Sequence, residues 1–198
     1  MTVPSVSANP ITTWLWSLDR PSRWIRLLFA VVCGSALLVL SAKIQVPMPF
    51  VPATLQTGAV AFLALVLGFR LAMVTLAVYF AQGIVGLPVF SAGGGWAYLI
   101  TSPTAGFLWG FALIIAVVAI LVRTLPPAFG RWHAPLAGLI GIYAVYLPGV
   151  MWLRFVFGDW SRAFEAGFWP FILGDAIKGL LAGCLALVLV RLTRNLIK

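Results

Sequence analysis

Residues 168–190 read FWPFILGDAIKGLLAGCLALVLV, and this stretch is long and apolar enough to cross a lipid bilayer. A membrane-spanning helix needs about 20 predominantly apolar residues. Asp175 and Lys178 lie three positions apart, so a helix places both side chains on one face. Each charge costs about 2.5–3.5 kcal/mol at the centre of a membrane helix. The stretch therefore predicts a transmembrane helix whose acid and base either join helices together or hold a polar solute.

The chain as a whole is also strongly apolar. Of its 198 residues, 63% are hydrophobic and only 9% are charged, and the mean hydropathy is +1.09. A soluble domain is about 45–50% apolar and about 25% charged. The composition therefore predicts an all-α integral membrane protein, and the length fits a single membrane domain over residues 1–198. The net charge of +9 is spread among short loops, which indicates membrane orientation rather than nucleic-acid binding.

Hydropathy and helix-breaking residues divide the chain into six predicted transmembrane helices. The predicted spans cover residues 24–42, 55–69, 71–87, 104–122, 135–155 and 168–190. The second and third are short and are joined tightly at residues 68–70. Two connections are irregular, namely the proline-rich segment 43–52 and the segment 88–96 with its three consecutive glycines. Irregular backbone at membrane depth is tolerated where it lines a cavity, so these connections mark a candidate pocket.

Lysine and arginine are distributed unevenly between the two predicted sides. One side carries nine of them: Arg20, Arg23, Arg26, Arg70, Arg123, Arg131, Arg191, Arg194 and Lys198. The other side carries three: Lys43, Arg154 and Arg162. Because cytoplasmic loops are enriched in basic residues, the N-terminal segment 1–23 and the tail 191–198 are both predicted to be cytoplasmic. The irregular segments and the loop 156–167 then face outward, and a solute pocket opens on that side.

The acid–base pair lies beneath these outward segments. If the last helix begins at Phe168, Asp175 lies about 9–11 Å in from its outer end, at about 1.5 Å per residue. One interpretation is a structural ion pair within the helix or with a neighbouring helix. The other is a ligand site, because a carboxylate accepts hydrogen bonds and an ammonium donates them. The pair would then suit a compact solute that presents N–H donors beside a carbonyl.

Three further residues are candidates for the pocket. Gln56 either belongs to a solvated helix start that Thr54 caps, or supplies hydrogen bonds to a ligand. Tyr98 follows the glycine segment, where it either anchors the membrane interface or forms a pocket wall. Gly94 lies at the centre of the glycine triplet. The triplet matches neither GxxxxGK[ST] nor GxGxxG, so it predicts no ATP site.

Ala30 and Gly34 form a small-xxx-small pattern in the first span. Such patterns let helices approach each other closely. The pattern is explained equally by packing within this chain and by docking onto a partner protein.

The chain offers little for catalysis or metal binding. Cys33 and Cys184 both fall in predicted spans, where we expect buried packing rather than a disulfide. His133 falls in a predicted loop with no second ligand at metal spacing. Four acids are present, Asp19, Asp159, Glu165 and Asp175, and only the last lies within a span. We therefore expect neither an enzyme nor a metal site.

Several ordered motifs resemble one known family. They are SAKIQVP at 41–47, TLQT at 54–57, GIVGLPVF at 83–90, SPTAGF at 102–107 and PFILGDAIK at 170–178. These segments cover most of the chain, from about residue 40 to about residue 183. They resemble the BioY family, the biotin-specific substrate-binding (S) components of energy-coupling factor (ECF) transporters.

The resemblance implies a six-helix S-component fold and a biotin pocket covered by the outward loops. The family's Asp-x-x-Lys motif binds biotin and falls on Asp175 and Lys178. We expect the biotin-binding residues to be Asp175, Lys178, Gln56, Tyr98 and Gly94. Some relatives carry an asparagine near the glycine segment, whereas residues 91–95 here contain none.

The resemblance also implies partners and a location. The family's small-xxx-small motif docks a transmembrane coupling subunit, and this role falls on Ala30 and Gly34. Two partner ATP-binding subunits would drive transport, and the chain itself would need no cofactor, biotin being the transported ligand. The expected location is the bacterial cell (inner) membrane, as a multi-pass protein.

Three alternatives remain open at this point. The chain could carry biotin without ATPase partners, as a single chain or as a homo-oligomer. It could carry another small vitamin of similar polarity. It could also be a membrane assembly protein whose ion pair only stabilises helix packing.

Overall fold

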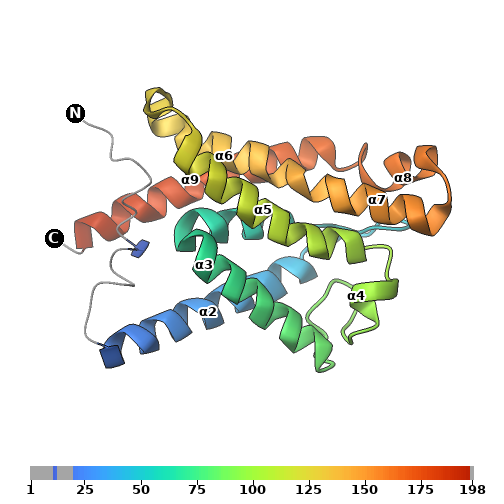
Figure 1. Ribbon diagram of the computed structural model, residues 1–198, viewed down its shortest axis with the longest axis horizontal. Coiled ribbons are helices and arrows are strands. Elements are labelled where there is room, and N and C mark those ends of the chain that lie inside the picture. The colour runs from blue at the N-terminus through green and yellow to red at the C-terminus, as the bar shows by residue number, and fades with distance from the viewer. Residues whose placement is uncertain (1–10, 13–19, 197–198) are drawn as a thin grey trace.

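The computed structural model describes residues 11–12 and 20–196 as a bundle of long helices (Figure 1). The main elements in chain order are α2 (Arg20–Lys43), β1 (Gln45–Val46), β2 (Ala53–Thr54), α3 (Gln56–Ile84), α4 (Tyr98–Thr101), α5 (Ala105–Thr124), η2 (Pro127–Trp132), α6 (His133–Ile142), η3 (Tyr143–Val145), α7 (Tyr146–Phe157), α8 (Trp160–Gly167) and α9 (Ile172–Leu196). The predicted N-terminal segment 1–23 lies mostly outside the described residues, and so do residues 197–198 of the predicted tail.

Among the described residues, five helical stretches are long and apolar enough to cross a membrane. They are Ser22–Lys43, Gln56–Ile84, Ala105–Thr124, Ala128–Phe157 and Ile172–Thr193. Their outer surfaces carry large apolar side chains; on α9, for example, Leu181, Leu185 and Leu192 are each more than half exposed. A soluble monomer rarely exposes so much contiguous apolar surface, whereas lipid tails cover it at no cost. The predicted spans 24–42, 104–122, 135–155 and 168–190 each fall mainly on one of these stretches.

The predicted second and third spans, 55–69 and 71–87, both fall on α3. Gly68 interrupts this helix with φ 72° and ψ 172°. A positive φ of this size is open to glycine at little cost, whereas a Cβ would be strained there. Figure 1 shows the two parts of α3 running in different directions on either side of this bend. The tight connection expected at residues 68–70 is therefore a sharp break at Gly68, where two helical segments of α3 join.

The predicted span 135–155 is divided in the middle. The helix α6 ends at Ile142, the 3₁₀ turn η3 covers Tyr143–Val145, and α7 continues from Tyr146. A 3₁₀ turn has about 3.0 residues per turn, so side chains three positions apart point the same way. The turn therefore aligns the side chains of Tyr143 and Tyr146.

The last helix starts later than the hydropathy suggested. α9 begins at Ile172 rather than Phe168, and it extends past residue 190 to Leu196. Residues 168–171 form a turn instead, in which the Phe168 carbonyl accepts from the N–H groups of Phe171 and Ile172, and Pro170 has no N–H with which to extend the helix backwards. Asp175 therefore lies in the first turn of α9. The estimate that it lies 9–11 Å into the helix was wrong.

The irregular connections gather at one end of the bundle. The strands β1 and β2 pair antiparallel, with Gln45 opposite Thr54, and bracket the proline-rich loop. This hairpin, α4 and α8 lie at one end in Figure 1, while the start of α2 and the end of α9 lie at the other. Residues 160–167 of the predicted outer loop form α8, whose N-cap Asp159 accepts a hydrogen bond from the Arg162 backbone N–H at 2.8 Å.

Two expectations about single residues were wrong. Cys33 and Cys184 lie on α2 and α9 as free, exposed thiols rather than as buried packing residues. They occupy helix faces that point away from the bundle, and a membrane protein can expose such apolar positions to lipid. His133 does not lie in a loop but begins α6 and is buried, because the helix starts two residues earlier than expected.

Candidate functional site

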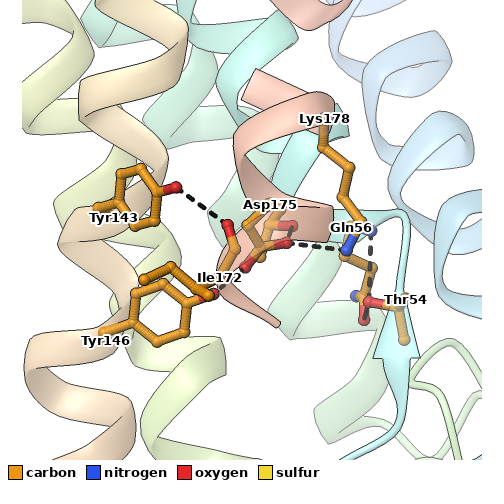
Figure 2. Close-up of polar contacts among 8 residues, drawn as sticks. Thr54, Gln56, Tyr143, Tyr146, Ile172, Asp175 and Lys178 are labelled. Atoms are coloured by element: carbon orange, nitrogen blue, oxygen red, sulfur yellow. Dashed lines mark hydrogen bonds and ion pairs between the residues drawn. The ribbon is translucent and has the colours of Figure 1, made fainter. Parts of the chain in front are cut away.

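The carboxylate of Asp175 is the centre of the site. Asp175 is only 3% exposed, and its carboxylate accepts three hydrogen bonds (Figure 2). Oδ1 accepts from Lys178 Nζ at 2.8 Å and from the Thr57 hydroxyl at 3.0 Å. Oδ2 accepts from the Tyr146 hydroxyl at 2.6 Å. The acid and base predicted from the sequence are therefore in direct contact, as an ion pair whose acid is further bonded to two hydroxyls.

These bonds explain how a charge can lie inside the bundle. A buried carboxylate is costly unless it is paired and fully hydrogen-bonded. The donors come from α3, α7 and α9, so Asp175 joins three helices. Gly58 on α3 makes room for Lys178, because a Cβ there would lie 3.1 Å from Lys178 Cβ. The lysine side chain consequently lies against α3 and remains 17% exposed.

A small cavity adjoins the ion pair. Its polar lining consists of Thr54, Gln56, Thr57, Ser91, Thr104, Asp175 and Lys178. The other lining residues present mainly apolar surface: Val51, Pro52, Phe107, Leu108, Phe111, Phe171 and the ring of Tyr146. The cavity measures about 50 Å³, well below the roughly 300–1,000 Å³ of typical small-molecule pockets. A vitamin-sized solute can enter only if the side chains around this cavity move apart.

Gln56 lines the cavity and is 3% exposed, and its contact with a ligand stays a prediction. Its Nε2 donates to the Tyr79 hydroxyl at 2.7 Å, and its Oε1 accepts from Thr54 at 3.3 Å. The Tyr79 hydroxyl in turn donates to the Val89 carbonyl at 3.1 Å. Gln56 therefore links the start of α3 to the segment before the glycine triplet.

Tyr98 supports the cavity wall rather than lining it, and Gly94 is not among the described residues that line the cavity. The Tyr98 hydroxyl accepts a hydrogen bond from Thr104 at 3.1 Å and lies 2.9 Å from the Ser91 hydroxyl, and both of these partners line the cavity. The Tyr98 ring stacks on Phe90 at 5.2 Å between centroids. Gly94 lies so close to Leu87 that a Cβ would overlap the Leu87 carbonyl oxygen. Direct contact of either residue with a ligand stays a prediction.

Gly34 is buried at a contact between helices of this chain. A Cβ on Gly34 would lie 2.8 Å from Thr75 Cγ2 on α3. Nearby, the Ser35 hydroxyl donates to Gln82 Oε1 at 2.8 Å and joins the same two helices. Ala30 is half-buried against the same core. The pattern thus packs α2 onto α3, and its role in docking a partner stays a prediction.

Sequence reasoning missed Tyr146, which donates the shortest bond to Asp175. The two residues are 29 positions apart, so no local pattern connects them. A weak signal was present, since a tyrosine hydroxyl inside an apolar span needs a hydrogen-bond partner. Thr104 and Phe107 were likewise quoted only as part of a motif, although both line the cavity.

A helical membrane bundle with a polar, partly closed site beneath its loops is the architecture of a solute-binding membrane subunit. The structure matches the crystal structure of the S-component for biotin from an ECF-type ABC transporter, with a TM-score of 0.74. The match covers 90% of this chain and 95% of that one, at 21% sequence identity. This likeness confirms the expected helical S-component fold.

The sequence comparisons identify the family. The sequence profile of the BioY family matches residues 12–195, and the chain belongs to this family. It is 37% identical to the biotin transporter BioY of Thermotoga maritima, over 80% of this chain and 92% of that protein. It is 31% identical to the biotin transporter BioY2 of Lactococcus lactis subsp. cremoris, over 81% and 88% of the two chains. The resemblance seen in the motifs is confirmed, and the chain is a multi-pass membrane protein.

Proposed function

We propose that this protein is the biotin-binding S component of an ECF-type transporter and captures biotin from the outer side of the membrane. The observation that carries the proposal is the buried Asp175–Lys178 pair beside the cavity, in a chain whose relatives are named as biotin transporters. The pair lies toward the loop end of the bundle, in the first turns of α9. This position supports capture from the side on which the hairpin and glycine segments lie.

The chemistry of the pair suits the ureido ring of biotin. That ring presents two N–H donors and one carbonyl acceptor on a rigid frame. A carboxylate accepts from N–H groups, and an ammonium donates to a carbonyl. Hydrogen bonds to charged groups are about twice as strong as those between neutral groups. Asp175 would accept a ureido N–H, and Lys178 would donate to the ureido oxygen.

Access requires movement of the proline-rich loop. Val51 and Pro52 line the small cavity, while Met48 to Phe50 line a second hollow of about 410 Å³. The Phe50 ring meets Phe157 edge to face at 4.9 Å, which fixes the loop to the end of α7. Displacement of this loop would open the small cavity and make room for a solute of vitamin size.

The remaining features of the S component belong to the same proposal. The two parts of α3 would cross the membrane as separate segments, which gives six spans with both termini in the cytoplasm of a bacterial cell. Ala30 and Gly34 would contribute to docking of a transmembrane coupling subunit. Two ATP-binding subunits would supply the energy. Biotin uptake by proteoliposomes that contain this chain alone would instead favour a stand-alone carrier.

Calorimetric titration of the purified chain with biotin tests the proposal. We expect wild-type protein to bind, and Asp175→Asn and Lys178→Ala to lose at least a hundredfold in affinity. Asp159→Asn is the matched control, because Asp159 is an exposed helix cap on α8. Absence of binding by the wild type, or wild-type affinity in both site variants, would contradict the proposal.

A further inference from the structure

Two tyrosine hydroxyls reach the first turn of α9 from the joint between α6 and α7. Tyr143 opens the 3₁₀ turn η3, and Tyr146 follows it at the start of α7. Their targets, Ile172 and Asp175, are also three residues apart, on one face of α9. The Tyr143 hydroxyl donates to the Ile172 carbonyl at 2.9 Å, and the Tyr146 hydroxyl donates to Asp175 Oδ2 at 2.6 Å. Figure 2 shows both tyrosines pointing toward this turn.

The two bonds have different targets. Tyr143 binds the main-chain carbonyl of Ile172 and does not bond to the carboxylate. Tyr146 binds the carboxylate that we assign to the ligand. The Tyr146 ring is buried and packs edge to face against Phe107 at 6.4 Å and Phe168 at 5.0 Å. Because these contacts fix the ring, the hydroxyl has little freedom to turn away from Asp175.

The bond from Tyr146 limits how many acceptor positions the Asp175 carboxylate can offer to a ligand. Each carboxylate oxygen offers about two acceptor positions. Within the described part of the chain, Oδ1 uses both of its positions, for Lys178 and Thr57, and Oδ2 uses one, for Tyr146. One position on Oδ2 is left for an N–H group of a ligand. Of the three ammonium N–H groups of Lys178, one is bonded to Asp175, and among the described residues the other two have no partner and are available to a carbonyl.

We propose that Tyr146 is a positioning residue for the ligand. Its hydroxyl fixes the rotation of the Asp175 carboxylate. A ligand therefore meets one fixed pattern, which consists of the remaining acceptor position on Oδ2 beside the remaining N–H donors of Lys178. That pattern matches a solute with an N–H beside a carbonyl, and it discriminates against solutes that lack the N–H. The inference rests on the proposed function, in which Asp175 accepts from the ligand.

The test compares binding of biotin by two matched variants. Tyr146→Phe keeps the ring and its packing and removes only the hydroxyl, and we expect biotin affinity to fall about tenfold. Tyr143→Phe removes the same atom but leaves the carboxylate untouched, and we expect a change below about threefold. In an Asp175→Asn background, Tyr146→Phe should cause no further loss, since the effect passes through the carboxylate. An equal loss in both backgrounds, or unchanged affinity of Tyr146→Phe, would overturn the inference.

A measurement without ligand separates this inference from the proposed function. The infrared band of the Asp175 carboxylate is assigned by difference against Asp175→Asn. We expect Tyr146→Phe to shift this band and Tyr143→Phe to leave it in place. A band that does not move in Tyr146→Phe would overturn the positioning role even if biotin binds. A shifted band in a protein that does not bind biotin would support the positioning role and count against the biotin assignment.

Discussion

Lys43 Nζ donates to the main-chain carbonyl of Phe90 at 2.7 Å, so the last residue of α2 holds the segment that precedes the glycine triplet. Phe90 is fully buried, and its N–H bonds back to the Gly93 carbonyl at 2.9 Å. This lysine was counted in the sequence only as an outward-facing charge. The structure gives it a second role, in which it fixes one wall of the loop region above the site.

We expect Lys43→Met to loosen residues 91–97. The substitution keeps the length of the side chain but removes the donor, so the Phe90 carbonyl loses a charge-assisted hydrogen bond. We expect a loss of about 1 kcal/mol in the free energy of unfolding, less than the roughly 1.5–3 kcal/mol typical of bonds to charged groups because Lys43 is exposed. Hydrogen exchange of the amides in residues 91–97 should become faster. Lys43→Arg keeps a donor and should behave like the wild type, whereas equal exchange rates in all three proteins would contradict the prediction.

The sequence predicted the parts of the site that are local. Asp175 and Lys178 share one helical face and stand out in an apolar stretch, so their contact followed from spacing alone. The bend at Gly68 was likewise signalled by a short polar connection between two apolar runs. The start of α9 was not predictable from hydropathy, because residues 168–171 are as apolar as the helix that follows them.

The contacts that reach across the bundle could not be predicted. Tyr146 and Thr57 meet Asp175 from 29 and 118 residues away, and only the packing of α3, α7 and α9 brings them together. The same holds for Gly34, whose close approach to Thr75 joins two helices. A small-xxx-small pattern indicates that something packs closely, but not whether that partner lies within the chain.

The ion pair predicts non-additive stability. Lys178→Met leaves the Asp175 carboxylate buried without its countercharge, and we expect a loss of about 3 kcal/mol in stability. Adding Asp175→Asn removes that buried charge as well, and most of the loss should be recovered. Biotin binding should be absent from both variants. Thermal melting in detergent measures the first effect and calorimetry the second.

The outcome of this comparison decides what the pair is for. If the double variant still bound biotin, the pair would not hold the ligand and would serve only to join the helices. If the double variant melted as low as Lys178→Met, the cost would come from lost packing of the lysine side chain against Gly58 rather than from the unpaired charge.

Gly34 offers a test of packing against docking. Gly34→Leu forces a side chain into the contact with Thr75, and overpacking of this kind typically costs about 1–3 kcal/mol. We therefore expect a lower melting temperature for the isolated chain, without any partner present. Ala36→Leu is the control, because Ala36 lies exposed on the same helix. An unchanged melting temperature of Gly34→Leu, with loss of uptake only when partner subunits are present, would favour docking over internal packing.

Two glycines near the site should respond to alanine in opposite ways. At Gly94 a Cβ would overlap the Leu87 carbonyl oxygen. Because the backbone fixes the positions of both atoms, no rotamer change relieves the clash. We expect Gly94→Ala to displace the glycine segment, to lower stability by about 1–3 kcal/mol and to weaken biotin binding. Gly174 lies in the first turn of α9 with no atom within 4 Å of its Cβ position among the described residues. Gly174→Ala should therefore gain about 0.5–1 kcal/mol from helix propensity and leave biotin affinity unchanged. Denaturation measures the stability of both variants, and calorimetry measures their biotin affinity. If Gly94→Ala were as stable as Gly174→Ala, the clash between a Cβ at position 94 and the Leu87 carbonyl would be contradicted.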